Sequence, residues 1–396
     1  MVTVHRRLER NHADALRATV AAARALEAQG RRIARLDIGE PHFPTPPHIV
    51  DAAHAAMRDG ATKYVSPQGL AELRDAIATA QRSRGVDASA DDVVVTPGVK
   101  PMLMYALMAV CGTGDEVLVP DPGYPGYAAS VRLAGATARR YPLTEVGASF
   151  SIDMDALGTC ITPSTRVLIL NSPHNPTGMV IDRIALEAIA ELAMRHDLWV
   201  LSDEIYSALT YDRAAPPSIA TLPGMRDRTI IVDGFSKAYA MTGWRLGYAV
   251  LPSALVGDMT ALVADGSTCT PPFVQYAGVA ALTGPQGALA DMRRAYASGR
   301  DALTAQLRSI DGIRVATPDG ALYAFANASE LMRDLEIRSS SDLSLELLHQ
   351  YHLACVGGSA FGERGEHHLR FSFAVAGDQL ADALARLAAW GRRRRT

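Results

Sequence analysis

The chain is poor in lysine. Of its 39 basic residues only three are lysines, Lys63, Lys100 and Lys237, and the other 36 are arginines. An arginine guanidinium stays protonated, whereas a lysine amine can lose its proton when it is desolvated or lies near another cation, and can then attack a carbonyl group. Lys237 follows an apolar run in the segment FSKAYAMTGWRLG (residues 235–247) and is the first candidate for a reactive amine. The alternative is an ordinary surface lysine in a loop.

Cysteines are also few. The four that are present, Cys111, Cys160, Cys269 and Cys355, lie far apart and form no CxxC pair. This spacing argues against a disulfide framework and against a zinc site, so we predict no metal site. Buried thiols in a reducing compartment are the simpler interpretation, and a cytoplasmic location is therefore expected.

Long apolar runs are absent as well. No stretch approaches the ~18 uninterrupted apolar residues of a membrane span, and residues 1–30 lack the apolar centre of a signal peptide. The net charge of −3 gives no general attraction to nucleic acid. We therefore expect neither a membrane nor a nucleic-acid partner. The arginine run at 392–395 is the one strong block of charge, and it is interpreted as a solvated helix end or frayed tail.

The 396 residues favour two domains. Helices are expected at about 13–29, 46–58 and 69–84. From residue 92 onward, apolar strands alternate with amphipathic helices, which predicts an α/β domain whose mostly parallel sheet is covered on both faces. Ligands of such sheets bind beyond the carboxyl ends of the strands, and that is where the polar motifs fall: Gly98, Tyr124, Asn175, Asp203 and Lys237.

The order of expected helices and strands changes in the last third of the chain. After about residue 285 the pattern is helix, strands, helix, strand and helix, typical of a smaller α+β domain. We predict an N-terminal segment (1–45) that packs with this small domain, a large domain (46–284) that binds a cofactor, and the small domain itself (285–396).

Asp203 supports the interpretation of Lys237 as a reactive amine. It ends an apolar strand in VLSDEIY, and a buried carboxylate is costly unless it is paired. A pyridinium N–H is one suitable partner, and a lysine imine combined with such an Asp is the signature of a pyridoxal phosphate site. Tyr206 would then contact the phenolic oxygen of the ring. The alternative is a helix N-cap Asp beside an ordinary core Tyr.

Further segments fit the same cofactor. The amide of Asn175, in NSPHNPTG, is a candidate donor to the phenolic oxygen, although a turn without a ligand has the same sequence. Gly98, Val99 and Lys100 in TPGVK open a helix, whose free N–H groups suit a phosphate. Lys100 also has a simpler interpretation as a solvated lysine.

Two arginines and one aromatic residue complete the candidate site. The guanidinium of Arg245, eight residues after Lys237, suits the phosphate. Tyr124 is a candidate for stacking on a flat ring, although a core aromatic is the commoner use. Arg370, in HLRFSFAV, suits a substrate carboxylate through its planar fork, with a surface arginine as the alternative.

With these residues, the chain resembles the class I/II aminotransferases, which have the aspartate-aminotransferase type of pyridoxal-phosphate fold (fold type I). The resemblance covers roughly residues 15–390. It rests on these motifs: GEPHFPTP (39–46), KYVSPQGLAELRDAIA (63–78), VTPGVKPML (95–103), GDEVLVPDPGYPGY (114–127), NSPHNPTG (171–178), SDEIY (202–206), FSKAYAMTGWRLGY (235–248) and LRFSFA (369–374).

The resemblance implies a role for each matching residue. Lys237 would be the Schiff-base lysine and proton-transfer base, and Asp203 would keep the ring nitrogen protonated. The implied catalytic residues are Lys237, Asp203 and Tyr206. The implied cofactor-binding residues are Gly98, Val99, Lys100, Tyr124, Asn175, Asp203, Tyr206, Ser236, Lys237 and Arg245, with Tyr64 reaching the phosphate of the neighbouring subunit of a homodimer. The implied substrate-binding residues are Gly39, Asn175 and Arg370.

Two departures from the family pattern stand out. Many members have a phosphate-binding Ser three residues before the lysine, where this chain has Gly234, and Lys100 is a candidate replacement. Some dicarboxylate-specific members bind the substrate side chain through a basic residue of the neighbouring subunit. The segment GSTCTPPF (266–273), where such a residue is expected, has none. This weakens the case for strict specificity for aspartate and glutamate.

The expected function is exchange of the amino group between an L-amino acid and a 2-oxo acid. A β C–S lyase, a decarboxylase or another secondary-metabolism enzyme with the same cofactor is the alternative. A ligand-sensing regulator is disfavoured, because the ~12 residues before the first predicted helix leave no room for a DNA-binding domain. A nicotinamide enzyme is disfavoured because no G-x-G-x-x-G opens a helix after a strand.

Overall fold

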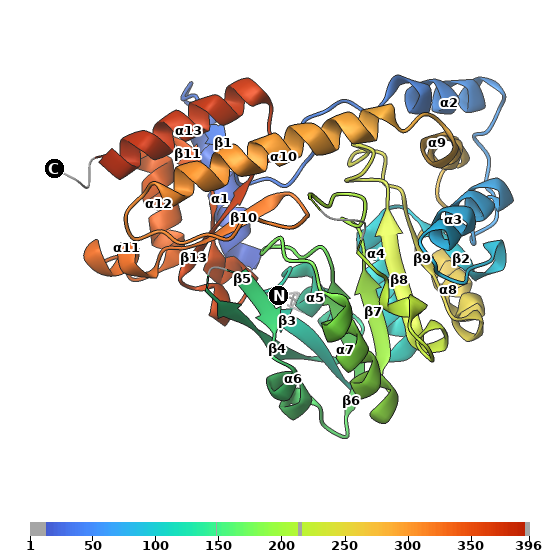
Figure 1. Ribbon diagram of the computed structural model, residues 1–396. Helices are drawn as coiled ribbons and strands as arrows, with labels where there is room; N and C mark the ends of the chain where they lie inside the picture. Colours follow the sequence, from blue (N-terminus) through green and yellow to red (C-terminus); the bar gives the residue numbers. More distant parts are fainter. Residues whose placement is uncertain (1–12, 148, 213–215, 393–396) are drawn as a thin grey trace, which may run out of the picture.

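The computed structural model describes residues 13–147, 149–212 and 216–392 (Figure 1). Its centre is an eight-stranded sheet with the spatial order β2-β9-β8-β7-β6-β3-β4-β5. The strands are β2 (Val93–Thr96), β3 (Glu116–Asp121), β4 (Thr137–Val146), β5 (Ser149–Ile152), β6 (Thr165–Asn171), β7 (Trp199–Asp203), β8 (Thr229–Gly234) and β9 (Gly247–Val250). Only β9 and β5 run against their neighbours, so the predicted α/β fold with a mostly parallel sheet is confirmed.

Helices cover both faces of this sheet, which explains why the inner strands β3, β6, β7 and β8 are buried along almost their whole length. Along β6, Val167 and Ile169 point to the face covered by α4, α5 and α8, whereas Leu168 and Leu170 point to α6 and α7. Helices α2, α3 and α9 cover the face opposite to α4, α5 and α8, near β2, β8 and β9. The bounds are α2 (Pro47–Arg58), α3 (Ala71–Ser83), α4 (Val99–Val110), α5 (Gly126–Leu133), α6 (Met154–Cys160), α7 (Arg183–Arg195), α8 (Ser253–Ser267) and α9 (Pro272–Thr283).

The C-terminal third forms the smaller α+β part. Its antiparallel sheet has the order β10-β13-β12. The long helix α10 extends from the region of α9 to this small sheet (Figure 1). The elements are α10 (Gly287–Arg308), β10 (Tyr323–Asn327), α11 (Ser329–Asp334), α12 (Ser340–Tyr351), β11 (Leu353–Ala354), β12 (Val356–Gly357), β13 (His368–Ser372) and α13 (Gly377–Arg392).

The N-terminal segment lies against this smaller part. Strand β1 (Ala34–Arg35) pairs in parallel with β11, and α1 (Ala13–Ala28) contacts α12 and the short turn at Gly358–Phe361. In Figure 1 both elements lie among the C-terminal helices.

Two strand features were not predicted. The hairpin formed by β4 and β5 extends one edge of the large sheet, and β9 inserts between β2 and β8. Strand β9 spans only four residues and begins at Gly247, so it is too short to display a clear alternation. It follows the lysine segment directly and brings Gly247 opposite Gly234.

Among the described residues, no helix combines the length and the apolar character that crossing a bilayer requires. Of the arginine run, Arg392 ends α13, and residues 393–395 lie outside the described residues.

Candidate active site

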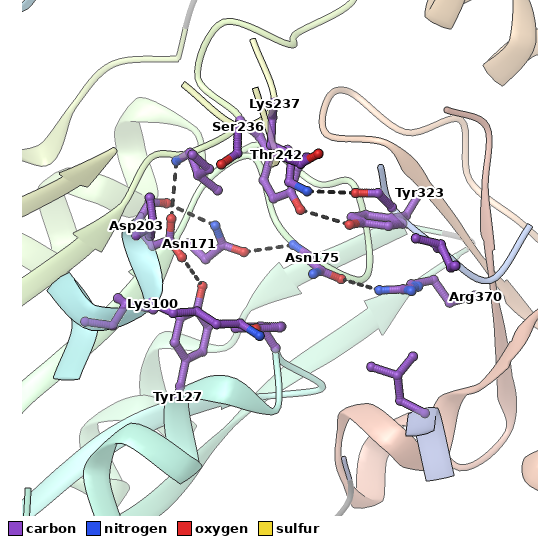
Figure 2. Close-up of a pocket in the computed structure, with 18 of the residues that line it drawn as sticks. Lys100, Tyr127, Asn171, Asn175, Asp203, Ser236, Lys237, Thr242, Tyr323 and Arg370 are labelled. Carbon is purple, nitrogen blue, oxygen red and sulfur yellow. Dashed lines mark hydrogen bonds between the residues drawn. The ribbon is translucent and has the colours of Figure 1, made fainter. Parts of the chain in front are cut away.

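A cavity of about 550 Å³ lies at the carboxyl ends of β3, β6, β7 and β8 (Figure 2). The small sheet contributes Tyr323 and Arg370 to its wall, and α1 contributes Leu16 and Val20. Most of the predicted site residues line it: Gly39, Val99, Lys100, Tyr124, Asn175, Asp203, Tyr206, Ser236, Lys237, Arg245 and Arg370. The sequence prediction that the polar motifs meet beyond the strand ends therefore agrees with the geometry.

Lys237 points into this cavity from the turn after β8. It is half-buried, and its Nζ donates a hydrogen bond to the carbonyl oxygen of Gly39 at 2.8 Å. Burial lowers the pKa of the amine, Tyr323 opposes that shift, and the positive charges of Arg370 and Lys100 add to it. A neutral amine, which is the nucleophilic form, is therefore easier to reach here than on the surface.

Asp203 is the last residue of β7 and only 4% exposed. Its Oδ2 accepts a hydrogen bond from the Tyr127 hydroxyl at 2.7 Å, and its Oδ1 accepts one from the Ile205 amide at 3.2 Å. Burial raises the pKa of this carboxyl to about 6. A carboxylate has about four acceptor sites, so two donors leave room for a further N–H from the cavity.

A hydrogen-bonded network joins the two ends of the cavity (Figure 2). The side-chain NH₂ of Asn171 donates to the backbone carbonyl oxygen of Asp203 at 3.0 Å. The Oδ1 of Asn171 accepts a hydrogen bond from the backbone N–H of Asn175 at 2.8 Å. The hydroxyls of Tyr206 and Tyr323 lie 2.9 Å apart. Asn175 and Tyr206 are thereby held between Asp203 on one side and the small sheet on the other.

Arg370 is the third residue of β13 and 4% exposed, so the alternative of a surface arginine is wrong. Its Nη1 donates to Asn175 Oδ1 at 3.1 Å and its Nη2 to the Asp37 carbonyl oxygen at 2.8 Å. The guanidinium also lies over the rings of Tyr323 and Phe361, at 4.3 and 4.8 Å from their centroids.

None of these partners neutralises the charge of Arg370. Among the described residues, no carboxylate forms a salt bridge with it, and its Nε is buried without a hydrogen-bond partner. A buried charge in this state is costly, and an anionic group in the cavity would compensate it. Arg370 is therefore suited to a substrate carboxylate.

The opposite end of the cavity suits a phosphate. Helix α4 begins at Val99, so its free N–H groups lie at this end of the cavity, which Lys100, Ser236 and Arg245 also line. Gly98 has a φ of +98°, and a Cβ there would lie 2.4 Å from Arg245 Nη2. Arg245 itself has a φ of +58°, a strained conformation for a residue other than glycine. Close packing against Gly98 and a hydrogen bond from Nη1 to the Thr242 carbonyl oxygen at 2.9 Å place the guanidinium beside the helix start, so this end fits the phosphate of pyridoxal phosphate.

Two predicted residues lie outside the cavity lining. Gly98 contributes through its contact with Arg245, as described above. Tyr64 lies between α2 and α3, is 85% exposed and does not line the cavity. Its predicted role depends on a second subunit and stays a prediction.

Sequence reasoning missed several residues of the site, above all Tyr127, Asn171 and Tyr323. Tyr127 follows Tyr124 by three residues in PGYPGY, a spacing that places both rings on one side of a helix start, with centroids 5.4 Å apart. Asn171 ends the apolar run of β6, so its position at a strand end was a usable signal. Tyr323 comes from the distant β10, and no local pattern indicates its contact with Tyr206.

Gly234 has a packing explanation. A Cβ at this position would lie 2.9 Å from both the Leu246 carbonyl oxygen and Val99 Cγ2, because β9 and the start of α4 approach β8 closely here. A serine therefore does not fit without a backbone shift, whatever binds the phosphate.

We predict that Gly234→Ser lowers the free energy of unfolding of the cofactor-free protein by about 1–3 kcal/mol, the usual cost of overpacking. Gly112→Ser is the matched control, because a Cβ at Gly112 has no neighbour within 4 Å and the change is expected to stay within about 0.5 kcal/mol. Chemical denaturation of both variants measures the difference. Equal stability of the two variants would contradict the packing explanation.

The comparisons with known proteins agree with this geometry. The family model described as "Aminotransferase class I and II" matches residues 31–387. The chain is 38% identical to the aspartate aminotransferase of Musicola paradisiaca, over 92% of this chain and 90% of that one. It is 38% identical to aromatic-amino-acid aminotransferase 2 of Thermococcus litoralis, over 91% of this chain and 92% of that one. The solved aspartate aminotransferase of Rhizobium meliloti superposes with a TM-score of 0.92 at 33% identity, covering 99% of both chains.

These matches extend over nearly the whole chain and include both the large sheet and the small one. Members of this family generally use pyridoxal phosphate. The chain belongs to the class I and II aminotransferases and is an enzyme of the transaminase class.

Proposed function

We propose that this chain binds pyridoxal phosphate through a Schiff base with Lys237 and exchanges the amino group between an L-amino acid and a 2-oxo acid. One observation carries the proposal. A single cavity contains an amine whose pKa is lowered, a buried carboxylate, and a buried guanidinium without a carboxylate partner among the described residues. These are the groups needed for the aldehyde, the ring nitrogen and the substrate carboxylate.

The cavity suggests how the cofactor would be held. The start of α4 at Gly98 and Val99, together with Ser236 and Arg245, would bind the phosphate, and Lys100 would add a positive charge there. Tyr124 would pack against the ring. Asn175 and Tyr206 would contact the phenolic oxygen.

When bound, pyridoxal phosphate supplies an aldehyde that takes up the amino group and a ring that accepts electrons. The side chains of the protein would accept, hold and transfer the protons. Asp203 would accept a hydrogen bond from the ring nitrogen, and the positive charge of that N–H would favour the ionised carboxylate over the protonated form. Tyr127 would keep the carboxylate turned toward the ring through its hydrogen bond to Oδ2.

Lys237 would carry the proton that the reaction moves. Its Nζ would take the proton from Cα of the amino acid and return it to the cofactor. Arg370 would bind the α-carboxylate with its planar fork and thereby fix the direction of the Cα–H bond relative to the ring. Gly39, whose carbonyl accepts from Lys237, would contact the substrate through its backbone.

We further propose a homodimer in which the exposed Tyr64 reaches the phosphate of the partner subunit. A cytoplasmic location stays a prediction based on the four scattered cysteines. The proposed division into residues 1–45, 46–284 and 285–396 is supported by the pairing of β1 with β11 and by α9, which ends at Thr283.

A direct experiment tests the function. Purified protein mixed with pyridoxal phosphate should develop a visible absorption band that an amino donor removes and a 2-oxo acid restores. Aspartate, glutamate and aromatic amino acids are the first donors to test, because relatives of the chain are named for aspartate and for aromatic amino acids. One new amino acid should form for each new oxo acid. Release of ammonia, a thiol or carbon dioxide without such exchange would instead place the chain among lyases or decarboxylases.

A further inference from the structure

A buried cluster of charges lies behind the active site. Arg84, which follows α3, places its Nη2 2.5 Å from Glu204 Oε2 and its Nη1 3.9 Å from Asp233 Oδ2. Glu204 and Asp233 are 3% and 8% exposed. One guanidinium therefore faces two buried carboxylates, and the proposed reaction uses none of the three.

This cluster adjoins both central residues of the site through the backbone. Glu204 directly follows Asp203 at the end of β7, and Asp233 precedes Lys237 by four residues at the end of β8. Successive residues of a strand point to opposite faces of the sheet. Asp203 points to the face of α5, where Tyr127 meets it, while Glu204 and Asp233 point to the face of α3. The charged cluster and the cavity thus lie on opposite faces of the sheet, at the ends of the same two strands.

Glu204 is fully engaged. Besides Arg84, its Oε1 accepts hydrogen bonds from the hydroxyls of Ser202 at 3.0 Å and Ser218 at 2.6 Å. Its ionised form is well satisfied, and Arg84 is bound mainly to it. Glu204 therefore anchors the end of β7, directly beside Asp203.

Asp233 is less well satisfied. Its Oδ1 accepts from the Gly234 amide at 2.6 Å, but its Oδ2 has only the long contacts with Tyr248 at 3.3 Å and Ser207 at 3.4 Å. Arg84 lies beyond hydrogen-bond distance. A carboxyl with these partners gains little from being ionised.

We propose that Asp233 is a positioning residue whose charge, held behind the sheet by the Arg84–Glu204 pair, tunes the proton affinity of the Lys237–cofactor group. When Asp233 is ionised, its negative charge favours a proton on the positively charged group at Lys237. When Asp233 is protonated, that support is lost. The same carboxylate fixes the Gly234 amide at the start of the turn that carries Lys237.

The charges around Asp233 agree with a carboxyl that titrates near neutrality. Burial raises its pKa to about 7, Arg84 and the Gly234 amide oppose the shift, and Glu204 and Asp203 add to it. The other titratable groups that face it are Tyr248 of β9 and Tyr239 of the turn after Lys237, whose pKa values burial raises and Asp233 raises further. Both tyrosines stay neutral in this range, so they act on Asp233 only as dipoles.

The test is a pH titration of the absorption band of the bound cofactor, and it therefore rests on the proposed function. Asp233→Asn should lower the pKa of that band by about half a unit, the effect of losing one charge across a few strands of protein. Asp265→Asn, which removes an exposed carboxylate on α8, should leave the band within about 0.1 unit of wild type because solvent screens it. Tyr248→Phe, which removes one donor to the carboxylate, should shift the band in the same direction by less.

A second measurement does not need the cofactor. A carboxyl whose pKa is raised in the folded protein stabilises it below the pKa of the unfolded chain, near 4, and this stabilisation is lost as the pH rises through about 7. The denaturation midpoint of cofactor-free wild type should therefore fall between pH 5 and pH 8 more steeply than that of Asp233→Asn.

The outcomes separate the two proposals. Absence of any cofactor band contradicts the proposed function, while the denaturation series still decides whether Asp233 titrates. An unchanged titration of the band in both Asp233→Asn and Tyr248→Phe overturns the tuning role. If Asp233→Asn does not fold, the Tyr248→Phe titration decides alone.

Discussion

Lys237→Ala is expected to reduce amino-group exchange by about 10⁴-fold or more, because both nucleophilic catalysis and general base catalysis are lost together. The Lys237 amine can change both its covalent partner and its proton. Its pKa is already lowered by burial and by the nearby charges of Arg370 and Lys100. The measurement is kcat for the exchange reaction together with the absorption spectrum, in which the band of the bound cofactor should move to that of the free aldehyde.

Two further variants make this result specific. Lys237→Arg keeps the positive charge but cannot form a Schiff base, so it should be as inactive as the alanine variant. Lys63→Ala removes another of the three lysines, one that is exposed, and should keep the activity within about twofold. Substantial activity in Lys237→Arg would mean that the residue acts only through its charge and would refute the covalent role.

The positions of the site residues along the chain were predictable because of strand geometry. Asp203 and Asn175 follow apolar runs, and the carboxyl ends of parallel strands meet at one edge of a sheet. The sequence shows these runs directly, since β6 carries VLIL and β7 carries WVL before their polar ends. Lys237 was prominent for a different reason, the scarcity of lysine.

The partners of these residues were not predictable in the same way. Arg370 is one of 36 arginines; its motif made it a candidate, but no local pattern predicted that it would be buried. Its burial results from contacts with Asn175 and Asp37, which lie 195 and 333 residues away in the chain. Tyr323 meets Tyr206 across a separation of 117 residues. Such contacts depend on how the small sheet packs against the large one, and local propensity contains no information on that packing.

Gly234 is another residue whose surroundings could not be predicted from the sequence. From the sequence, Gly234 is noticeable only because the family resemblance implies a serine at this position. The reason lies in the approach of β9, a strand too short to be recognised, and of Val99 on α4. The residue is thus explained by tertiary packing, and no special chemistry has to be assumed for it.

Arg370→Met is expected to lower kcat/KM for amino acids and 2-oxo acids by about 10²–10³-fold, the usual result of removing one partner of a buried, hydrogen-bonded ion pair. The loss should be largest in KM, because the guanidinium binds the carboxylate in the ground state and in the transition state alike. The fold should survive. Among the described residues no carboxylate pairs with Arg370, so its removal leaves no buried charge unpaired there, only two carbonyl acceptors of Asn175 and Asp37.

Comparison with a substrate that lacks the carboxylate sharpens this prediction. A simple primary amine cannot use the guanidinium, so wild type and Arg370→Met should convert it equally slowly. Arg370→Lys keeps the charge but loses the planar fork, and it should recover only part of the lost kcat/KM. Arg314→Lys is the matched control, because Arg314 forms an exposed ion pair with Glu330 and should be replaceable without loss. If KM for amino acids stays at the wild-type value in Arg370→Met, the carboxylate binds elsewhere in the cavity, and Arg245 or Lys100 becomes the residue to test.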